Sequence, residues 1–396
     1  MASNTIDYIV SIVIVTALLT SSILLTAEDL NRASVYLQDQ QISYEAADIL
    51  NNILQNSGSP VDWGQTNSTP ISFGLNKPFA EYMMPSSLSP FTPMRLMKTD
   101  EVIIYDGIEY RNLTAEHTNL FLRLSEYLDY DQAADLLAVD TLFGFQVSMR
   151  PILDISIVQL EANPLKVGIS LQGLSGTVVG ALLNASLFHV IKDTPYPSIS
   201  TPLEGHAVSD ITGSAEIEFP SVNATEMLYM VLVKANLGGI SGIGYYTNAY
   251  SKDSPLLPIV TGYQEGEVSL VHRKNIAASY SYAGDVYYNL TFINQAGETA
   301  FRSVTLGMAY GTVNMTAPGL VSLSVGNPGI LLVSSKTETE YGLTAMPWGI
   351  TPFCLSMTYG ADPINKKTVV TKSQSVSING LSYQIELALW RFTVES

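Results

Sequence analysis

Residues Tyr8 to Ala27 form an uncharged, mostly apolar run close to the N-terminus. Eleven of these residues are Ile, Leu or Val, and six are Ser or Thr. A helix of about 20 residues rises about 30 Å, which matches the hydrocarbon thickness of a bilayer. A polar, helix-compatible stretch then continues to Asn56. We therefore expect one long helix over residues 1–57, hydrophobic at 8–27, that sits in a membrane or in the core of a filament.

Three interpretations of this run remain open. A cleaved secretory signal usually has a basic segment before the apolar one, whereas residues 1–7 contain Asp7 and no base. A membrane anchor is favoured because each Ile, Leu or Val adds about 0.3 to 0.6 kcal/mol to insertion and no charge is buried. A filament-type helix is favoured by small residues at helical spacing, which let helix backbones approach closely. The helix-packing candidates are Tyr8, Ile12, Thr16, Ala17, Thr20, Ser21 and Leu24.

The polar half of this helix keeps apolar residues near a period of 3.6, which predicts that it docks on a folded body. The positions that carry this prediction are Leu30, Ala33, Leu37, Tyr44, Ala47, Leu50 and Leu54. Gly58 and Pro60 follow in the order that is typical of a helix end. The upper half would then pack among lipids or sister helices while the lower half holds the body.

The charge balance limits the partners of the chain. There are 36 Asp and Glu residues against 19 Lys and Arg, a formal net charge of −17. Such a chain repels nucleic acid and anionic surfaces, so no nucleic-acid partner is expected. Cys354 is the only cysteine, which excludes a disulfide within the chain and any metal site built from several cysteines.

Beyond the helix the sequence is strand-rich, with Gly, Asn and Pro between short strands, which is typical of antiparallel sandwiches. Residues 58–140 read as a connector that contains a hairpin around Asp106-Gly107 and a helix over 115–139. Residues 141–260 and 261–396 are predicted to be two β-sandwich domains, the second ending in a hairpin around Asn379-Gly380. The predicted fold class is mainly β with a long N-terminal α-helix and antiparallel, immunoglobulin-like β-sandwich ectodomains.

Catalytic motifs do not emerge from the sequence. The four His residues lack metal-ligand spacing, and the acidic residues around Asp129, Asp131 and Asp135 lack the EF-hand pattern. The Gly-rich segment 238–244 precedes a strand rather than a helix, so it predicts a bend where sheets meet and not an anion site. No catalytic, cofactor-binding or metal residues are assigned and no cofactor is expected. The alternative to a non-enzymatic protein is a single-span membrane-anchored extracellular enzyme or ligand-binding module.

Asn-x-Ser/Thr sequons are spread over the part of the chain that follows the helix, which is compatible with an exported, glycosylated ectodomain. They lie at Asn67, Asn112, Asn184, Asn223, Asn289 and Asn314.

Three short phrases add a resemblance to the evidence of the helix. They are Gly58-Ser59-Pro60-Val61-Asp62-Trp63-Gly64, Phe73-Gly74-Leu75 and Met94-Arg95-Leu96. With the apolar helix, they make the first hundred residues or so resemble archaeal type IV pilin-like proteins and related membrane-anchored cell-surface proteins. Residues Gly176 to Ala181, followed by Asn184-Ala185-Ser186, look similar to immunoglobulin-like surface modules.

This resemblance implies a structural or adhesive surface protein that is tethered or polymerised through its N-terminal helix. Its partners would be membrane lipid or sister subunits, in a homo-oligomer or filament, with glycans on the sequons. Its location would be the cell membrane, with a single pass and an extracellular C-terminal region, or an extracellular filament. Asp7 would match the acid that guides pilin assembly if processing occurred after Ala2.

Overall fold

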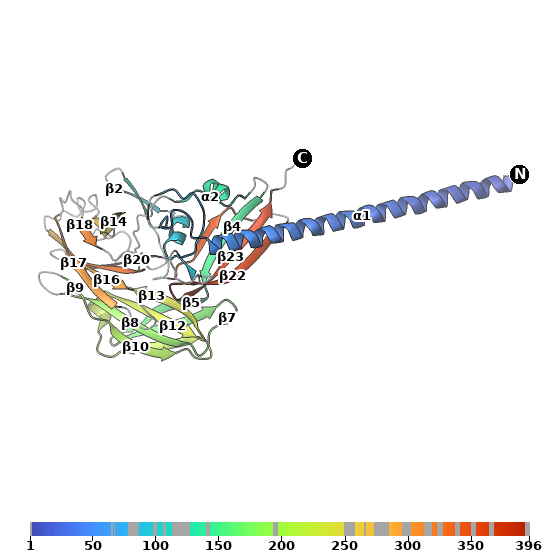
Figure 1. The fold of residues 1–396 in the computed structure, drawn as a ribbon. Coiled ribbons are helices and arrows are strands. Elements are labelled where there is room, and N and C mark those ends of the chain that lie inside the picture. The colour runs from blue at the N-terminus through green and yellow to red at the C-terminus, as the bar shows by residue number, and fades with distance from the viewer. Residues whose placement is uncertain are drawn as a thin grey trace.

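The protein is a long helix joined to a β-rich body, and the N-terminal part of the helix projects away from that body (Figure 1). The computed structural model describes residues 2–64, 66, 68–77, 87–97, 101–105, 108–112, 127–139, 143–192, 197–248, 258–264, 267–272, 285–294, 302–312, 319–322, 328–336, 341–349, 354–363 and 368–392. The expectation of a mainly β fold with a long N-terminal helix is confirmed.

Helix α1 spans Ala2–Gln55 as one unbroken element of 54 residues. At 1.5 Å per residue it is about 80 Å long. It contains neither Gly nor Pro, so nothing in its sequence interrupts the backbone hydrogen bonds. It ends just before Gly58, whose φ of +77° is the left-handed conformation that Gly adopts readily after a helix.

The C-terminal half of α1 packs on a five-stranded sheet formed among the described residues. In spatial order its strands are β1 (Ser87–Leu88), β22 (Val369–Ile378), β23 (Leu381–Arg391), β4 (Phe143–Pro151) and β21 (Met357–Gly360). Strand β23 buries Leu381, Tyr383, Ile385, Leu387 and Leu389 on one face, the period of two that a half-covered strand requires.

A second core lies between two curled sheets, in which apolar side chains from both sheets are buried together. One sheet has the order β10 (Leu203–Val208), β8 (Leu182–Ile191), β12 (Tyr229–Leu237) and β13 (Ile240–Thr247), with β9 (Ser198–Ile199) paired to β8. The other has the order β11 (Ser214–Phe219), β6 (Leu165–Gly173) and β5 (Leu153–Ala162), with β7 (Gly176–Thr177) paired to β6.

The segment 238–244 has two roles that the predicted bend only partly describes. Gly238 and Gly239 form the turn between β12 and β13, with φ values of +58° and +87°. Gly242 and Gly244 let β13 approach β5, because an added Cβ would lie 2.8 Å from Leu153 Cβ and 2.7 Å from Ile155 Cβ. The sheets therefore do meet here, but the tight turn comes earlier in the segment.

Other described strands complete the body. A four-stranded sheet has the order β17 (Arg302–Thr312), β16 (Asp285–Asn294), β19 (Gly329–Lys336) and β20 (Tyr341–Trp348). A three-stranded sheet has the order β14 (Pro258–Gln264), β15 (Glu267–His272) and β18 (Gly319–Ser322). Strands β2 (Glu101–Tyr105) and β3 (Ile108–Asn112) pair antiparallel, and short helices are η1 (Thr92–Leu96), α2 (Tyr130–Leu136) and η2 (Ala224–Glu226).

Both predicted hairpins have their strands paired as expected. Strand β22 pairs antiparallel with β23 across Asn379-Gly380, and both turn residues have positive φ, at +49° and +81°. The helix predicted over 115–139 is shorter where the structure describes it: Tyr127 to Asp129 are not helical and α2 begins at Tyr130. Residues 115–126 lie outside the described part of the chain.

The described sheets are curled half-barrels, and their strand orders do not establish the immunoglobulin-like sandwiches that we expected. Strands β21 and β23 pair with β4, and β22 pairs with β1, whereas β16, β17, β19 and β20 form a different sheet. One sheet thus takes strands from three of the four predicted segments, 58–140, 141–260 and 261–396. The segment boundaries themselves stay a prediction. Local strand patterns cannot reveal such long-range pairings, because every candidate partner has the same alternation.

Candidate functional site

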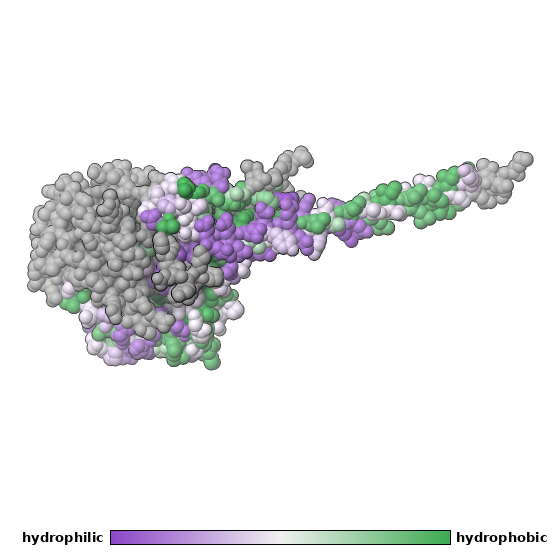
Figure 2. All heavy atoms as spheres, in the orientation of Figure 1, coloured by the Kyte–Doolittle hydropathy of each residue, from purple (hydrophilic) through white to green (hydrophobic). Residues whose placement is uncertain are grey.

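The outer part of α1 has no cover within the described chain. Its large apolar side chains from Tyr8 to Leu25 are between 49% and 69% exposed. Figure 2 shows this apolar surface along the projecting part of the helix, and hydrophilic surface nearer the body. By length and composition it is the one described helix that is able to cross a membrane. A helix that is apolar all round needs lipid or neighbouring helices to cover it.

The predicted packing residues all lie on this exposed part. They are Tyr8, Ile12, Thr16, Ala17, Thr20, Ser21 and Leu24. The hydroxyls of Thr16, Thr20 and Thr26 each donate to the carbonyl four residues earlier, at 2.8 Å. These hydroxyls are therefore satisfied inside the helix, which lowers the cost of moving them out of water. Asp7 belongs to α1, but its side chain lies outside the described residues.

The lower part of α1 docks on the body through a different face from the predicted one. The buried residues are Ile42, Ala46, Ile49, Leu50, Ile53 and Leu54. Of the seven positions expected to dock, only Leu50 and Leu54 are buried, and Ala47 is half-buried. The sequence contains two apolar stripes at helical spacing, and periodicity alone does not show which one docks. The docked stripe has Ile42, Ala46, Ile49 and Ile53, whereas the other begins at Leu30.

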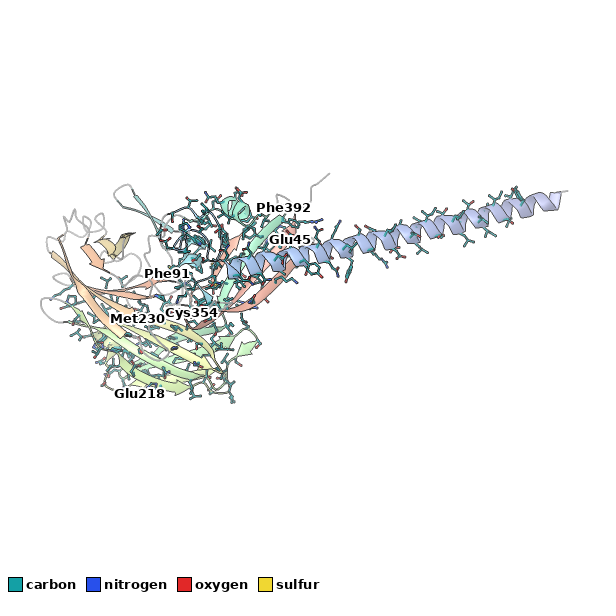
Figure 3. All side chains as sticks on the ribbon, viewed as in Figure 1. Glu45, Phe91, Glu218, Met230, Cys354 and Phe392 are labelled. Carbon is teal, nitrogen blue, oxygen red and sulfur yellow. The ribbon has the colours of Figure 1, made fainter. Side chains whose placement is uncertain are left out.

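That second stripe is exposed and lies opposite the docked face. Leu30, Leu37 and Tyr44 are 66%, 64% and 70% exposed, and Ala33 is exposed as well. Ala33, Leu37 and Tyr44 each precede a docked residue by nine positions, and nine residues make two and a half turns. The stripe therefore faces away from the body. Figure 3 labels Glu45 on the part of the helix that lies against the body, three residues after the buried Ile42.

The end of α1 is tied to the body by backbone hydrogen bonds. The last carbonyls of a helix lack partners within it, and here one of them and the carbonyl of the residue just after the helix are satisfied from outside. The Leu75 amide donates to the Ile53 carbonyl at 2.8 Å, and the Asn76 amide donates to the Asn56 carbonyl at 2.9 Å. The Trp63 indole donates to the Ser57 carbonyl at 3.2 Å. These bonds hold the helix rigidly where it enters the body.

Gly58 and Gly74 explain why this junction is so close. A Cβ on Gly74 would lie 2.1 Å from the Asn56 carbonyl oxygen, and one on Gly58 would lie 2.4 Å from the Trp63 indole nitrogen. Real Cβ atoms do not approach other atoms this closely, so each of these positions requires glycine.

Arg95 locks the loop that follows α1. It is 2% exposed, and its Nη1 donates to the carbonyls of Trp63 at 2.6 Å, Thr66 at 3.3 Å and Ser68 at 2.8 Å. The guanidinium also lies 5.5 Å from the centroid of the Trp63 ring, a cation–π contact. The sequence did not predict this role, because the residues that Arg95 contacts lie about 30 positions away and form no motif with it.

The sequons occupy different settings. Asn112 ends β3, Asn184 lies within β8 and Asn289 lies within β16. Asn223 precedes η2 on an exposed loop. Asn67 and Asn314 lie outside the described residues.

Groups of three or more His, Cys, Asp or Glu side chains that could hold a metal ion do not occur among the described residues. His206 is engaged with Asn184, since its Nδ1 lies 2.7 Å from the Asn184 Oδ1. Cys354 is buried, which raises the pKa of its thiol to about 12. Such a thiol stays protonated near neutral pH, and a protonated thiol is a poor nucleophile.

Comparisons with known proteins identify no family. No family model matches the chain, and no curated protein matches it. Among solved structures, the sporulation control protein Spo0M from Bacillus subtilis matches at 9% identity and a TM-score of 0.15, over 50% of this chain and 90% of that one. Human GIVD cytosolic phospholipase A2 matches at 9% identity and a TM-score of 0.11, over 65% of this chain and 31% of that one. At these scores neither match carries an argument about fold or function.

Proposed function

We propose that this protein is a non-enzymatic surface protein that α1 tethers to the cell membrane or joins to sister subunits, with the β body presented outward. The observation that supports this most directly is the uncovered apolar surface of α1 between Tyr8 and Leu25. Insertion of its Ile, Leu and Val residues into lipid is worth roughly 3 to 7 kcal/mol at the values of a biological insertion scale. No charged side chain of this run has to be buried.

The exposed stripe of Leu30, Ala33, Leu37 and Tyr44 favours an assembly of sister copies over a lone anchor. Leu30, Ala33 and Leu37 follow the spacing of 3 and 4 that places apolar side chains along a coiled-coil seam, and Tyr44 follows one heptad after Leu37, with Gln40 at the seam position between them. Because the stripe faces away from the body, a second α1 can approach it without meeting the β sheets of its own chain. A parallel arrangement would place all bodies on the same side of the membrane.

The finer parts of this proposal come from the sequence. They are an archaeal pilin-like origin, immunoglobulin-like β domains, an extracellular or filament location, an adhesive role and an assembly role for Asp7. N-terminal sequencing of the purified protein tests the last of these, since a mature start at Ser3 supports a pilin. Negative-stain microscopy distinguishes rods, which favour a polymer, from dispersed particles in detergent, which favour a simple anchor.

Two charges in the apolar run test the tether itself. Each Asp near the bilayer centre costs about 2.5 to 3.5 kcal/mol, so the variant Ile14→Asp with Leu18→Asp should cancel most of the gain from insertion. We expect the wild-type protein in the membrane fraction and the double variant largely in the soluble or aggregated fraction.

The matched control carries the same charges outside the run and off the exposed stripe, as Asn31→Asp with Gln38→Asp, and should remain membrane-bound. A double variant at Ile14 and Leu18 that stays in the membrane fraction as completely as wild type would contradict the tether.

A further inference from the structure

Three described sequons lie within β strands, where a glycan is hard to accommodate. Asn184 sits in β8 between His206 of β10 and Lys234 of β12. Asn289 sits in β16 between Met308 of β17 and Ser334 of β19. At Asn184 the side chains of the paired residues on the neighbouring strands lie about 5 Å away on both sides, so a sugar there displaces them. Asn112 is also paired within its strand, although at the end of β3.

Asn223 is different because it lies on an exposed turn with its sequon already organised. Its Oδ1 accepts a hydrogen bond from the Thr225 amide at 3.1 Å and another from the Thr225 hydroxyl. The backbone N–H and the hydroxyl of Thr225, the third residue of the sequon, thus both donate to the Asn223 side-chain oxygen. The amide nitrogen Nδ2, which has no hydrogen bond to the described residues, is left available.

A hollow opens directly beside this asparagine. It has a volume of about 530 Å³, is open to solvent and is lined by Asn223, Thr225, Glu226, Lys192, His189 and Met227, among others. Its size falls in the range of sites that hold small ligands. The hollow is therefore large enough to take sugar units attached at its rim.

The chemistry of the lining suits a carbohydrate. Lys192 is held at the hollow because its Nζ donates to the Glu226 carbonyl at 2.7 Å and lies 5.7 Å from the ring centroid of Tyr341. The Lys192 ammonium can donate to sugar hydroxyls, while the Met227 side chain offers apolar contact to a ring face.

We propose that Asn223 is N-glycosylated and that the first sugars lie in this hollow against Lys192. The inference rests on the proposed function, because glycan transfer requires an exported chain. In the transfer, Nδ2 attacks the anomeric carbon of an activated glycosyl phosphate bound by a transferase. A C–N bond forms, the C–O bond to the phosphate breaks, the phosphate leaves with the electron pair, and Nδ2 gives one proton to the transferase.

The test is glycopeptide mass spectrometry on the full chain purified from the membranes of its source organism. We expect sugar mass on the peptide that contains Asn223 and none on the peptide that contains Asn184. The variants Asn223→Gln and Thr225→Ala should each remove this mass, whereas Thr225→Ser, which keeps the hydroxyl, should retain it. Asn184→Gln is the matched control and should leave the total glycan mass unchanged.

Adding protease to intact cells of the source organism distinguishes a failure of the glycan proposal from a failure of the proposed function. A body that protease reaches, with Asn223 unmodified, overturns the glycan and leaves the proposed function standing. A body that protease does not reach, with Asn223 unmodified, overturns both. The position of the sugars has its own test: Lys192→Ala should speed their enzymatic release severalfold, and an unchanged rate of release contradicts their place in the hollow.

Discussion

Individual polar residues in this protein are held by backbone carbonyls as much as by other side chains. Arg95 is the clearest example, since one nitrogen of its guanidinium donates its two hydrogens among three carbonyls of the loop that follows α1. A planar guanidinium with several fixed donors suits this task, and a lysine ammonium does not reproduce its geometry. The loop between Trp63 and Ser68 therefore depends on a residue about 30 positions later.

Removing the Arg95 guanidinium should destabilise the protein strongly. Arg95→Met removes the donor from the buried Trp63 carbonyl and from two part-buried carbonyls, so we expect the free energy of unfolding to fall by about 2 to 3 kcal/mol. Arg95→Lys should recover only part of this loss. Denaturant titration measures both, and Arg150→Met serves as the control because Arg150 is exposed and, within the described part of the chain, bonds the Gln384 side chain alone. Losses of equal size at the two positions would contradict the role of Arg95.

His189 should make stability sensitive to pH. Burial lowers the pKa of His189 below its ordinary value, because its charged form loses hydration in the fold. The unfolded chain then binds a proton more readily than the folded one, so stability rises with pH across this window and falls as the pH drops from 7 to 5. We expect His189→Gln to reduce that fall in thermal melts at pH 7 and pH 5. An identical fall in the variant would exclude His189 as a cause.

At the scale of elements, α1 is a helix with two different apolar faces. The face with Ile42, Ala46 and Ile53 is covered by the body, and the stripe with Leu30, Ala33 and Leu37 is not. Helical periodicity reveals both faces but does not say which one docks. The β strands that cover the first face are more than 300 residues away in sequence, in β22 and β23.

A cysteine on the exposed stripe should report the contact between copies. Cys354 is buried, so a cysteine introduced at Ala33 is the accessible thiol of the folded chain. In membranes, Ala33→Cys should form a disulfide-linked dimer under mild oxidation, because thiols cross-link only when their Cα atoms approach within about 7 Å. Asn31→Cys, more than a third of a turn from Ala33, is the control and should cross-link much less. Non-reducing gels measure both, and equal yields would contradict the stripe as the interface.

At the scale of the whole molecule, the five-stranded sheet and strand β13 of the neighbouring sheet meet at Cys354. Its sulfur accepts a hydrogen bond from the Ile243 amide of β13 at 3.1 Å. The buried Tyr383 side chain of β23 lies close enough to interact with the same sulfur. Nearby, the Ile152 amide donates to the Ser382 carbonyl at 2.9 Å, and the Ser241 amide donates to the Ser382 hydroxyl at 3.2 Å. The five-stranded sheet and the curled sheets therefore share one contact region.

The rate at which a reagent alkylates Cys354 should depend on how often the contact between the five-stranded sheet and β13 opens. With a pKa of about 12, roughly one thiol in 10⁴ is ionised at pH 8, and burial blocks reagent as well. Ile385→Ala, which removes a fully buried side chain of β23, should lower stability by about 2 to 5 kcal/mol and raise the rate of alkylation. The exposed Val369→Ala should change the rate little. Fast alkylation of the wild-type chain in native buffer would show that the five-stranded sheet and β13 separate readily around Cys354.

The sequence by itself determined the elements whose signals are local. The absence of Gly and Pro from residues 2–55 and the apolar run at 8–27 predicted α1, and Asn379-Gly380 predicted the last hairpin because few residues adopt two positive φ angles in succession. Tertiary structure alone decided which face of α1 docks, which strands share a sheet, and that Arg95 clasps a distant loop. Those outcomes depend on packing between residues far apart in the chain, where many pairings satisfy the same local pattern and only the complete fold selects one.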